Sequence, residues 1–428
     1  MQSTLVRGVQ VFDGERWIPE GYVVVRGNRI SHMGEGAAPR ELVEECGRDM
    51  AFSPGEYLLM PGLVNAHTHV GMGLLRGVAD DVPFEKWLFE EILPRENRMN
   101  GDDVYFSGLL SQMEMARKGI TLFLDMYMFP QRVAQAVHEF GMRAAITRGL
   151  VDEEVERFGE TTRLQENIEL FEKWNGADGG RITVGFGPHS PYACSFELLE
   201  TVARVVRDFG SFVNIHIRES ARERQQYEIS RVAQSGIFDV PCFAAHCVHL
   251  SEEDMKLMAE KGVWIVHNPS SNLKLANGIA PVARMLENGC KVLLGTDSVA
   301  SNNSLDIWRE MLLTALVQKG FFHDPTLLPA SRVLQMAGPD AYQAMGFPDG
   351  GILKPGNLAD MVLLELHPID FFPPEQLLSH LVYSGGSAHV FATMVDGKWV
   401  YYEGAFPTID ADEVFSYLGP RNEALREK

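Results

Sequence analysis

The sequence predicts an α/β protein, with a (β/α)8 TIM-like barrel as its main unit and a small composite β-sandwich domain formed by both termini. Three observations lead to this prediction. Residues 59–350 alternate apolar strands with amphipathic helices, polar residues stand at the ends of those strands, and both ends of the chain are rich in short β segments. At 428 residues the chain exceeds the usual size of one compact core, which agrees with one large and one smaller domain.

The two ends of the chain share the sequence pattern of short strands separated by turns. Residues 1–58 contain "LVRGVQVFDGERW" and "GYVVVRGNRISHMG", in which Asp13-Gly14 and Gly27-Asn28 suit tight hairpin turns. The pattern returns in "FATMVDGKWVYYEGAF", with Asp396-Gly397 at the turn. Short β segments with apolar faces need a partner, so we expect 1–58 together with 351–420 to form one small β domain.

The middle of the chain, residues 59–350, reads as repeated strand–helix units. Helical stretches such as 102–119 and 195–210 end at a glycine, and Ser251 is suited to begin another helix as its N-cap. Eight such units fit a barrel better than an open sheet, and no GxGxxG joins a strand to a helix. The expected strands end near His69, Asp125, Arg148, His189, His216, His246, His267 and Asp297. The active site of such a barrel lies at these strand ends.

Composition narrows the class of protein. The chain is 45% apolar and 22% charged, as in an ordinary globular enzyme, and its formal net charge of −20 argues against binding nucleic acid or an anionic membrane through a basic face. No apolar run approaches the roughly 18 residues of a membrane span, and the first residues lack a signal-peptide core. The five cysteines form no CxxC pair. We therefore expect reduced thiols and a cytoplasmic protein.

The stretch "PGLVNAHTHVGMGLLRGV" contains two histidines separated by one residue. Because side chains alternate faces along a strand, Asn65, His67 and His69 share one face. Such a pair is a weak motif by itself, since two hydrogen-bonded core histidines would give the same pattern.

Three further strand ends favour a metal site. "NIHIRES" places Glu219 three residues after His216, "AAHCVHL" ends a strand with His246, and "KVLLGTDSVASNN" places Asp297 after an apolar strand. A lone buried carboxylate is costly without a charged partner, and three histidines with one aspartate suit Zn²⁺ or Fe²⁺. A bound metal would lower the pKa of a water, Asp297 could accept its proton, and Glu219 could act as general acid. His246 could be a ligand or a hydrogen-bond donor to the attacking water.

The same stretches, with "GFGPHSPY", "HNPSSNLKLANGIAPV" and "GTDSVASNNSLD", resemble the amidohydrolase superfamily and, within it, the methylthioadenosine/S-adenosylhomocysteine deaminases. The resemblance implies hydrolytic loss of ammonia from C6 of an adenine nucleoside, with one Zn²⁺ because the fourth strand lacks the lysine found in members with two metals. It makes Glu219 the proton shuttle to N1 of the purine and places His246 beside the attacking water. The metal ligands that it implies are His67, His69, His216 and Asp297.

The resemblance also assigns a substrate pocket. Trp87 and Glu96 would line the nucleoside site, with the Glu96 carboxylate accepting hydrogen bonds from the ribose hydroxyls. His189 would face the ligand, and Ser301 would lie within reach of the purine. From the residues alone, Trp87 could equally pack in a helix interface and Glu96 could be a solvated charge.

Two arginines match the residues that hold the homocysteine carboxylate in the family, Arg148 and Arg163. Guanidinium groups bind carboxylates bidentately, which suits a local anion site in an acidic chain. The alternative is pairing with nearby acids, Arg148 with Asp152 and Arg163 with Glu166. The acidic loop 152–162 between them is longer than the family pattern, and Arg218, Ser220 and Ser298 also depart from it, which we expect to reshape the pocket rim.

Two other functions remain open at this point. One is hydrolysis of a different aminated or halogenated heterocycle of triazine, guanine or cytosine type, and the other is a non-catalytic scaffold of the same fold. Glu96, Arg148 and Arg163 favour the nucleoside, because a free base has neither ribose nor carboxylate. The expected partner is therefore a small adenine nucleoside, and relatives that self-associate make a homo-oligomer compatible with the sequence.

Overall fold

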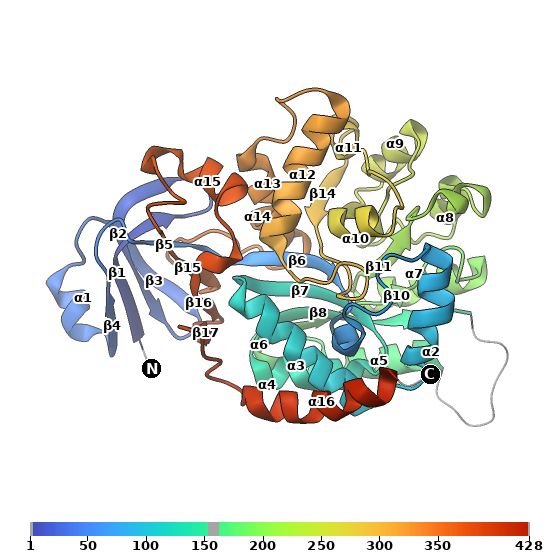
Figure 1. The fold of residues 1–428 in the computed structure, drawn as a ribbon, viewed down its shortest axis with the longest axis horizontal. Coiled ribbons are helices and arrows are strands. Elements are labelled where there is room, and N and C mark those ends of the chain that lie inside the picture. The colour runs from blue at the N-terminus through green and yellow to red at the C-terminus, as the bar shows by residue number, and fades with distance from the viewer. Residues whose placement is uncertain (1–2, 153–161, 427–428) are drawn as a thin grey trace.

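The computed structural model describes residues 3–152 and 162–426. It contains a large sheet at one end of the molecule and two parallel sheets surrounded by helices (Figure 1). None of the helices in these ranges is long and apolar enough to cross a membrane. All five cysteines are free, and four of them are buried, as the sequence predicts.

The large sheet combines strands from both ends of the chain, in the order β17-β16-β15-β5-β1-β2-β3, with β4 pairing β1. Turns at Gly27-Asn28 and Asp396-Gly397 close two of its hairpins, as predicted. These turns touch: a Cβ on Gly397, where φ is +76°, would lie 1.9 Å from the Gly27 carbonyl oxygen. The strands are β1 Ser3–Phe12, β2 Trp17–Arg26, β3 Arg29–Glu35, β4 Arg48–Ala51, β5 Tyr57–Pro61, β15 Met361–Glu365, β16 Val390–Val395 and β17 Lys398–Tyr402.

The middle of the chain supplies the two parallel sheets, whose strands end close to the positions expected from the sequence. One has the order β10-β8-β7-β6 with β9 on β8, and the other is β11-β12-β13-β14. Hydrogen bonds join the sheets at both edges, from the His216 N–H to the His189 carbonyl and from the Asp297 N–H to the His67 carbonyl. The strands are β6 Leu63–Thr68, β7 Ile120–Tyr127, β8 Arg143–Leu150, β9 Ile182–Val184, β10 Gly187–Pro188, β11 Val213–Ile217, β12 Cys242–His246, β13 Trp264–His267 and β14 Lys291–Leu294.

Helices follow most of these strands and lie on the outside of the parallel sheets (Figure 1). Ser251 caps α9 with a reciprocal bond to Asp254, and Gly210 ends α7 in the left-handed conformation, as the sequence indicates. The longer helices are α3 Gly101–Arg117, α4 Pro130–Phe140, α5 Arg163–Trp174, α7 Phe196–Phe209, α9 Glu252–Glu260, α12 Ile307–Phe322, α13 Ala330–Ala337 and α16 Ala411–Arg426. Short helices are α1 Arg40–Glu45, α2 Leu93–Glu96, α6 Ala177–Gly180, α8 Ile229–Gln234, α10 Pro269–Lys274, α11 Val282–Glu287, α14 Pro339–Ala344 and α15 Leu377–Tyr383. Short segments of other helical types are η1 Val70–Leu75, η2 Lys86–Ile92, η3 Ala221–Gln225, η4 Pro374–Gln376 and η5 Ser387–His389.

The C-terminal part of the chain contains helices that the β pattern of 351–420 did not anticipate. The helix α16 lies along α3 (Figure 1). Between these helices the Arg421 guanidinium binds the buried Asp103 carboxylate at 2.6 Å. This end of the chain therefore contacts the helices of the middle region as well as the large sheet.

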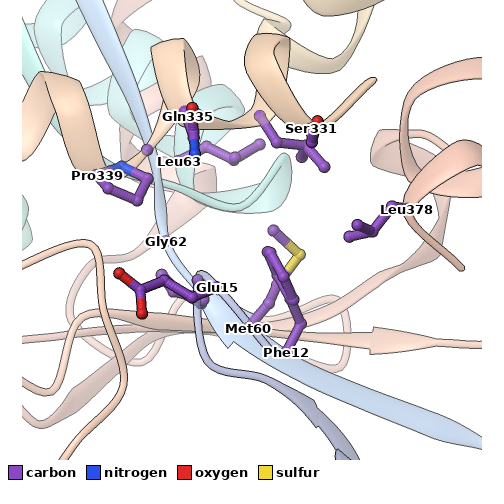
Figure 2. A pocket seen from close by; sticks show the side chains of 13 residues that line it. Phe12, Glu15, Met60, Gly62, Leu63, Ser331, Gln335, Pro339 and Leu378 are labelled. Atoms are coloured by element: carbon purple, nitrogen blue, oxygen red, sulfur yellow. The ribbon is translucent and has the colours of Figure 1, made fainter. Parts of the chain in front are cut away.

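The large sheet meets the amino-terminal ends of the parallel strands. A cavity of about 280 Å³ lies there, with Phe12, Glu15 and Met60 on one side and Ser331 and Gln335 of α13 on the other (Figure 2). Its wall is mainly apolar.

A buried ion pair also joins the two regions. The Arg143 guanidinium, 2% exposed at the start of β8, binds the Asp360 carboxylate at 2.7 and 3.1 Å, and Asp360 precedes β15. The Asp360 carboxylate also accepts the Asp396 N–H at 2.7 Å and the Tyr342 hydroxyl at 3.1 Å. Removing one partner of a buried ion pair leaves the other charge uncompensated and destabilises the folded protein.

We expect Asp360→Asn to destabilise the protein by about 3 kcal/mol, because it leaves the buried Arg143 charge without its full partner. Thermal denaturation followed by circular dichroism measures this as a lower Tm. The matched control is Asp49→Asn, whose carboxylate pairs with Arg7 at the surface and contributes about 0–1 kcal/mol. Equal shifts for the two variants would show that the Arg143 pair does not hold the two regions together.

Candidate active site

The carboxyl ends of four parallel strands bring together imidazoles and one carboxylate. His67 lies in β6, His69 directly follows that strand, and His216 lies in β11. The His69 Nε2 atom is 3.2 Å from Asp297 Oδ1 and 3.4 Å from His216 Nε2, and His67 Nε2 is 3.8 Å from Asp297 Oδ1. The residues that the sequence proposed as metal ligands therefore converge on one point.

This cluster fits a divalent metal ion. Both ring nitrogens of the buried His67 lack a hydrogen-bond partner among the described residues, which is costly unless another group meets them. The Nδ1 atoms of His69 and His216 face the carbonyl oxygens of Met126 and His189, so their Nε2 atoms point to the shared centre. Ligand atoms within 4.8 Å of one another form two groups, His67–His69–Asp297 and His67–His216–His246.

The protonation states of His67, His216 and Asp297 suit metal binding, whereas, against the effect of burial, the hydrogen bond and charge of Asp297 raise the pKa of His69 to about 9, so the His69 ring has to lose a proton before it can bind a metal. Burial and the neighbouring imidazoles hold the pKa values of His67 and His216 well below their usual range, so both rings are neutral. Burial opposes ionisation of Asp297, but the His69 hydrogen bond and nearby imidazoles hold its pKa well below the ordinary value. Neutral imidazoles and an ionised carboxylate are the forms that bind a metal.

The Asp297 carboxylate has a second set of partners. Its Oδ2 atom accepts hydrogen bonds from the hydroxyls of Ser271 at 2.6 Å and Ser301 at 2.7 Å. Ser301, expected from the sequence near the purine, is buried against Asp297 instead of lining the cavity, whereas Ser298 lines it. These bonds leave Oδ1 facing the imidazoles.

Glu219 and His246 lie side by side at this centre. Glu219 Oε2 is 3.8 Å from His246 Nε2, and Glu219 Oε1 accepts a 3.0 Å hydrogen bond from the Asn277 amide. Burial raises the pKa of Glu219 to about 7, so this carboxyl group can hold or release a proton near neutral pH. The His246 Nδ1 atom is 2.9 Å from Asn272 Oδ1, which turns Nε2 toward the cluster.

A cavity of about 400 Å³ opens over the cluster. Its wall also carries the apolar side chains of η2 and the ends of β7 and β8. The lining residues include His69, Trp87, Glu96, Arg148, Arg163, His189, His216, Glu219, His246 and Asp297. Every residue that the sequence proposed for the substrate, except Ser301, is part of this wall.

Three wall residues have environments that the sequence did not reveal. Glu96 accepts a 2.7 Å hydrogen bond from the Tyr127 hydroxyl, and burial raises its pKa. Trp87 is 7% exposed on η2, and its indole N–H has no partner among the residues that the structure describes. Burial lowers the pKa of His189 to about 4, so its ring is neutral.

The arginines lie at the edge of the cavity. Arg148 Nε binds Glu166 Oε2 at 2.6 Å, so the acid beside Arg148 is Glu166 and not Asp152. Arg163 is the first residue of α5 and lines the cavity. Residues 153–161 of the acidic loop 152–162 lie outside the described residues.

Several supporting residues were missed in the sequence. Ser271, Asn272 and Asn277 lie in "HNPSSNLKLANG", so their position in a stretch shared with the family was the available signal. Tyr127 ends β7, beside the strands that carry the histidines, and no motif marked it.

Comparison with known proteins agrees with this geometry. The sequence model of the amidohydrolase family matches residues 58–400. A 5-methylthioadenosine/S-adenosylhomocysteine deaminase from Thermotoga maritima is 48% identical over 357 residues, which are 83% of this chain and 86% of that protein. The protein of the same name from Pelotomaculum thermopropionicum is 39% identical over 100% of this chain and 99% of its own.

A solved structure has the same fold. The crystal structure of an adenosine deaminase from Xanthomonas campestris with bound zinc is 28% identical and has a TM-score of 0.91, covering 100% of this chain and 99% of that chain. The chain therefore belongs to the amidohydrolase family, and its sequence is similar to members named 5-methylthioadenosine/S-adenosylhomocysteine deaminase.

Proposed function

We propose that the protein is a metal-dependent hydrolytic deaminase of adenosine derivatives. Its substrates are S-adenosylhomocysteine, 5′-methylthioadenosine or a close relative, which it converts to the inosine analogue and ammonia. The observation that carries this proposal is the position of the buried Glu219 carboxyl group beside a histidine–aspartate cluster at the base of one cavity. The names of the curated relatives support the substrate class.

One Zn²⁺ would be held by His67, His69, His216 and Asp297. The same donors suit Fe²⁺, and the zinc bound in the Xanthomonas adenosine deaminase is the reason to prefer Zn²⁺. When bound, the metal supplies a Lewis acid that makes a water molecule acidic enough to attack at neutral pH. The unpartnered His67 nitrogens and the ionised Asp297 support this set.

The side chains of this chain would then manage the protons. Asp297 accepts a proton from the attacking water as oxygen bonds to C6 of the purine. Glu219, protonated near neutral pH, gives a proton to N1. The amino group then gains the proton that Asp297 took from the water and leaves as ammonia. The proton that remains on the added oxygen returns to Glu219 as the C6 carbonyl forms. His246, turned inward by Asn272, hydrogen-bonds the attacking water.

The wall of the cavity would hold the nucleoside. Glu96 accepts hydrogen bonds from ribose hydroxyls, Trp87 and His189 contact the nucleoside, and Ser301 acts through Asp297. Arg148 and Arg163, at the edge of the cavity, bind the carboxylate of a homocysteine substituent.

The architecture proposed with this function is a closed (β/α)8 barrel over residues 59–350 and a β-sandwich unit from 1–58 with 351–420. Hydrogen bonds at both edges of the two parallel sheets support closure, and the mixed-origin eight-stranded sheet supports the second unit.

We expect the zinc-loaded protein to convert at least one of S-adenosylhomocysteine, 5′-methylthioadenosine and adenosine to its inosine analogue. The reaction is followed by the change in purine absorbance and by ammonia release, and a chelator should abolish it until Zn²⁺ is returned. Guanine, cytosine and a chlorinated triazine are tested in the same way as alternative substrates. Turnover of one of these but of no nucleoside would contradict the proposal.

Glu219→Gln should lower kcat by about 10²- to 10⁴-fold, because an amide cannot transfer the proton to N1. Its zinc content, measured by mass spectrometry, should equal that of the wild type. Glu253→Gln, an exposed residue of α9, is the matched control with unchanged kcat. A Glu219→Gln enzyme with wild-type kcat would exclude this carboxyl group as the acid.

Glu96→Ala should lower kcat/KM for a nucleoside by roughly 30-fold, since a charged hydrogen bond contributes about 2 kcal/mol. The loss should shrink for a substrate analogue that lacks the ribose hydroxyls. Glu90→Ala, exposed on the neighbouring η2, controls for a change of charge at the cavity mouth. If Glu96→Ala affects both substrates equally, Glu96 does not bind the ribose.

A further inference from the structure

The main chain around Glu219 has an uncommon conformation. Arg218, directly before Glu219, has φ +50°, which is in the left-handed region that residues with a Cβ rarely occupy. Such a conformation persists only where neighbouring groups hold it in place. The chain must therefore contain contacts that fix this turn.

Two side chains from the following turn bind the backbone on both sides of Glu219. The Arg218 N–H donates to the Tyr227 hydroxyl oxygen at 2.9 Å, and the Tyr227 hydroxyl donates to Glu223 Oε2 at 2.6 Å. The other oxygen of that carboxylate, Glu223 Oε1, accepts the Ser220 N–H at 2.9 Å. One Tyr–Glu pair thus ties down the residues before and after Glu219.

A third residue fixes the Glu219 side chain. The buried Asn277 amide donates to Glu219 Oε1 at 3.0 Å, and the Asn277 carbonyl is itself bound by His249 Nε2 at 2.7 Å. Because Oε1 is engaged, Oε2 is the oxygen that faces His246 and the cavity. Asn277 therefore selects which carboxyl oxygen meets the substrate.

The side chain of Arg218, which is buried, contacts the same two residues, Tyr227 and Glu223. Its guanidinium lies 4.5 Å from the centre of the Tyr227 ring and donates to the Glu223 carbonyl. Neither Arg218 nor Tyr227 lines the cavity, so both act on the turn and not on a bound molecule.

We propose that Tyr227, Glu223 and Asn277 are positioning residues that hold Glu219 in the orientation needed to pass a proton to the substrate. This inference rests on the proposed function of Glu219. Proton transfer requires donor and acceptor to be placed within a fraction of an ångström. The three contacts that hold Glu219 should therefore affect the rate of the reaction and not the affinity for the substrate.

The test compares Tyr227→Phe and Asn277→Ala with Tyr105→Phe in the zinc-loaded full-length enzyme. Tyr105 also donates its hydroxyl to a carboxylate, that of Glu139, but lies on α3 outside the cavity. We expect kcat to fall by about 10- to 100-fold in the first two variants, with KM within about twofold of the wild type. Zinc content and Tm should match those of the control. Unchanged kcat, or a loss of kcat that follows a loss of zinc or of folding, would overturn the proposal.

A second measurement separates this inference from the proposed function. Amide hydrogen exchange over residues 218–227 requires no substrate, and Tyr227→Phe should speed exchange there by about tenfold relative to Tyr105→Phe. If the wild-type enzyme deaminates no nucleoside, the proposed function fails, while faster exchange still supports the role of Tyr227 in holding the turn around Glu219. Exchange that is equal in the two variants shows that Tyr227 does not hold this turn.

Discussion

The site depends on one electrostatic constraint, the burial of several imidazoles around the single carboxylate of Asp297. His67 shows the constraint most clearly, since neither of its ring nitrogens has a hydrogen-bond partner among the described residues. Burial keeps His67 and His216 neutral, and hydrogen bonds keep Asp297 ionised. A divalent cation shared by these groups would offset the cost of burying them, so the proposed metal would also favour the arrangement of side chains that the chemistry needs.

The direction of the parallel strands places the candidate active site and the contacts with the large sheet at opposite ends of the strands. Parallel strands place all their carboxyl ends on one side, where the histidines and Asp297 meet, and all their amino ends on the other. At the amino ends the large sheet is joined to the strands by the buried Arg143–Asp360 pair and its hydrogen bonds. Substitutions on that side would alter the stability of the protein, whereas those on the other side alter the reaction.

The proposed proton donor, Glu219, is held by residues that do not line the cavity. Glu219 lies beside His246, but its backbone is fixed by Tyr227 and Glu223 and its carboxyl group by Asn277. Asp297 is held in the same way by Ser271 and Ser301. Both proposed acid–base groups therefore have one oxygen engaged by the protein and one directed to the cluster, an arrangement that would limit the reorganisation needed during the proposed reaction.

The sequence by itself determined the strand–helix alternation and the polar residues at the strand ends, because side-chain periodicity and glycine or serine at helix ends are local properties. Together with the resemblance to a family it also named the residues of the cluster, the neighbouring Glu219 and most of the cavity wall. It did not show that Ser301 binds Asp297, that Glu166 pairs with Arg148, or that Tyr127 binds Glu96. Nor did it reveal the helices within 351–420 or the hydrogen bonds of Tyr227 and Glu223 around Glu219. Only the tertiary structure decided these contacts, because each depends on the distance and direction between side chains on separate turns or strands, which no local pattern records.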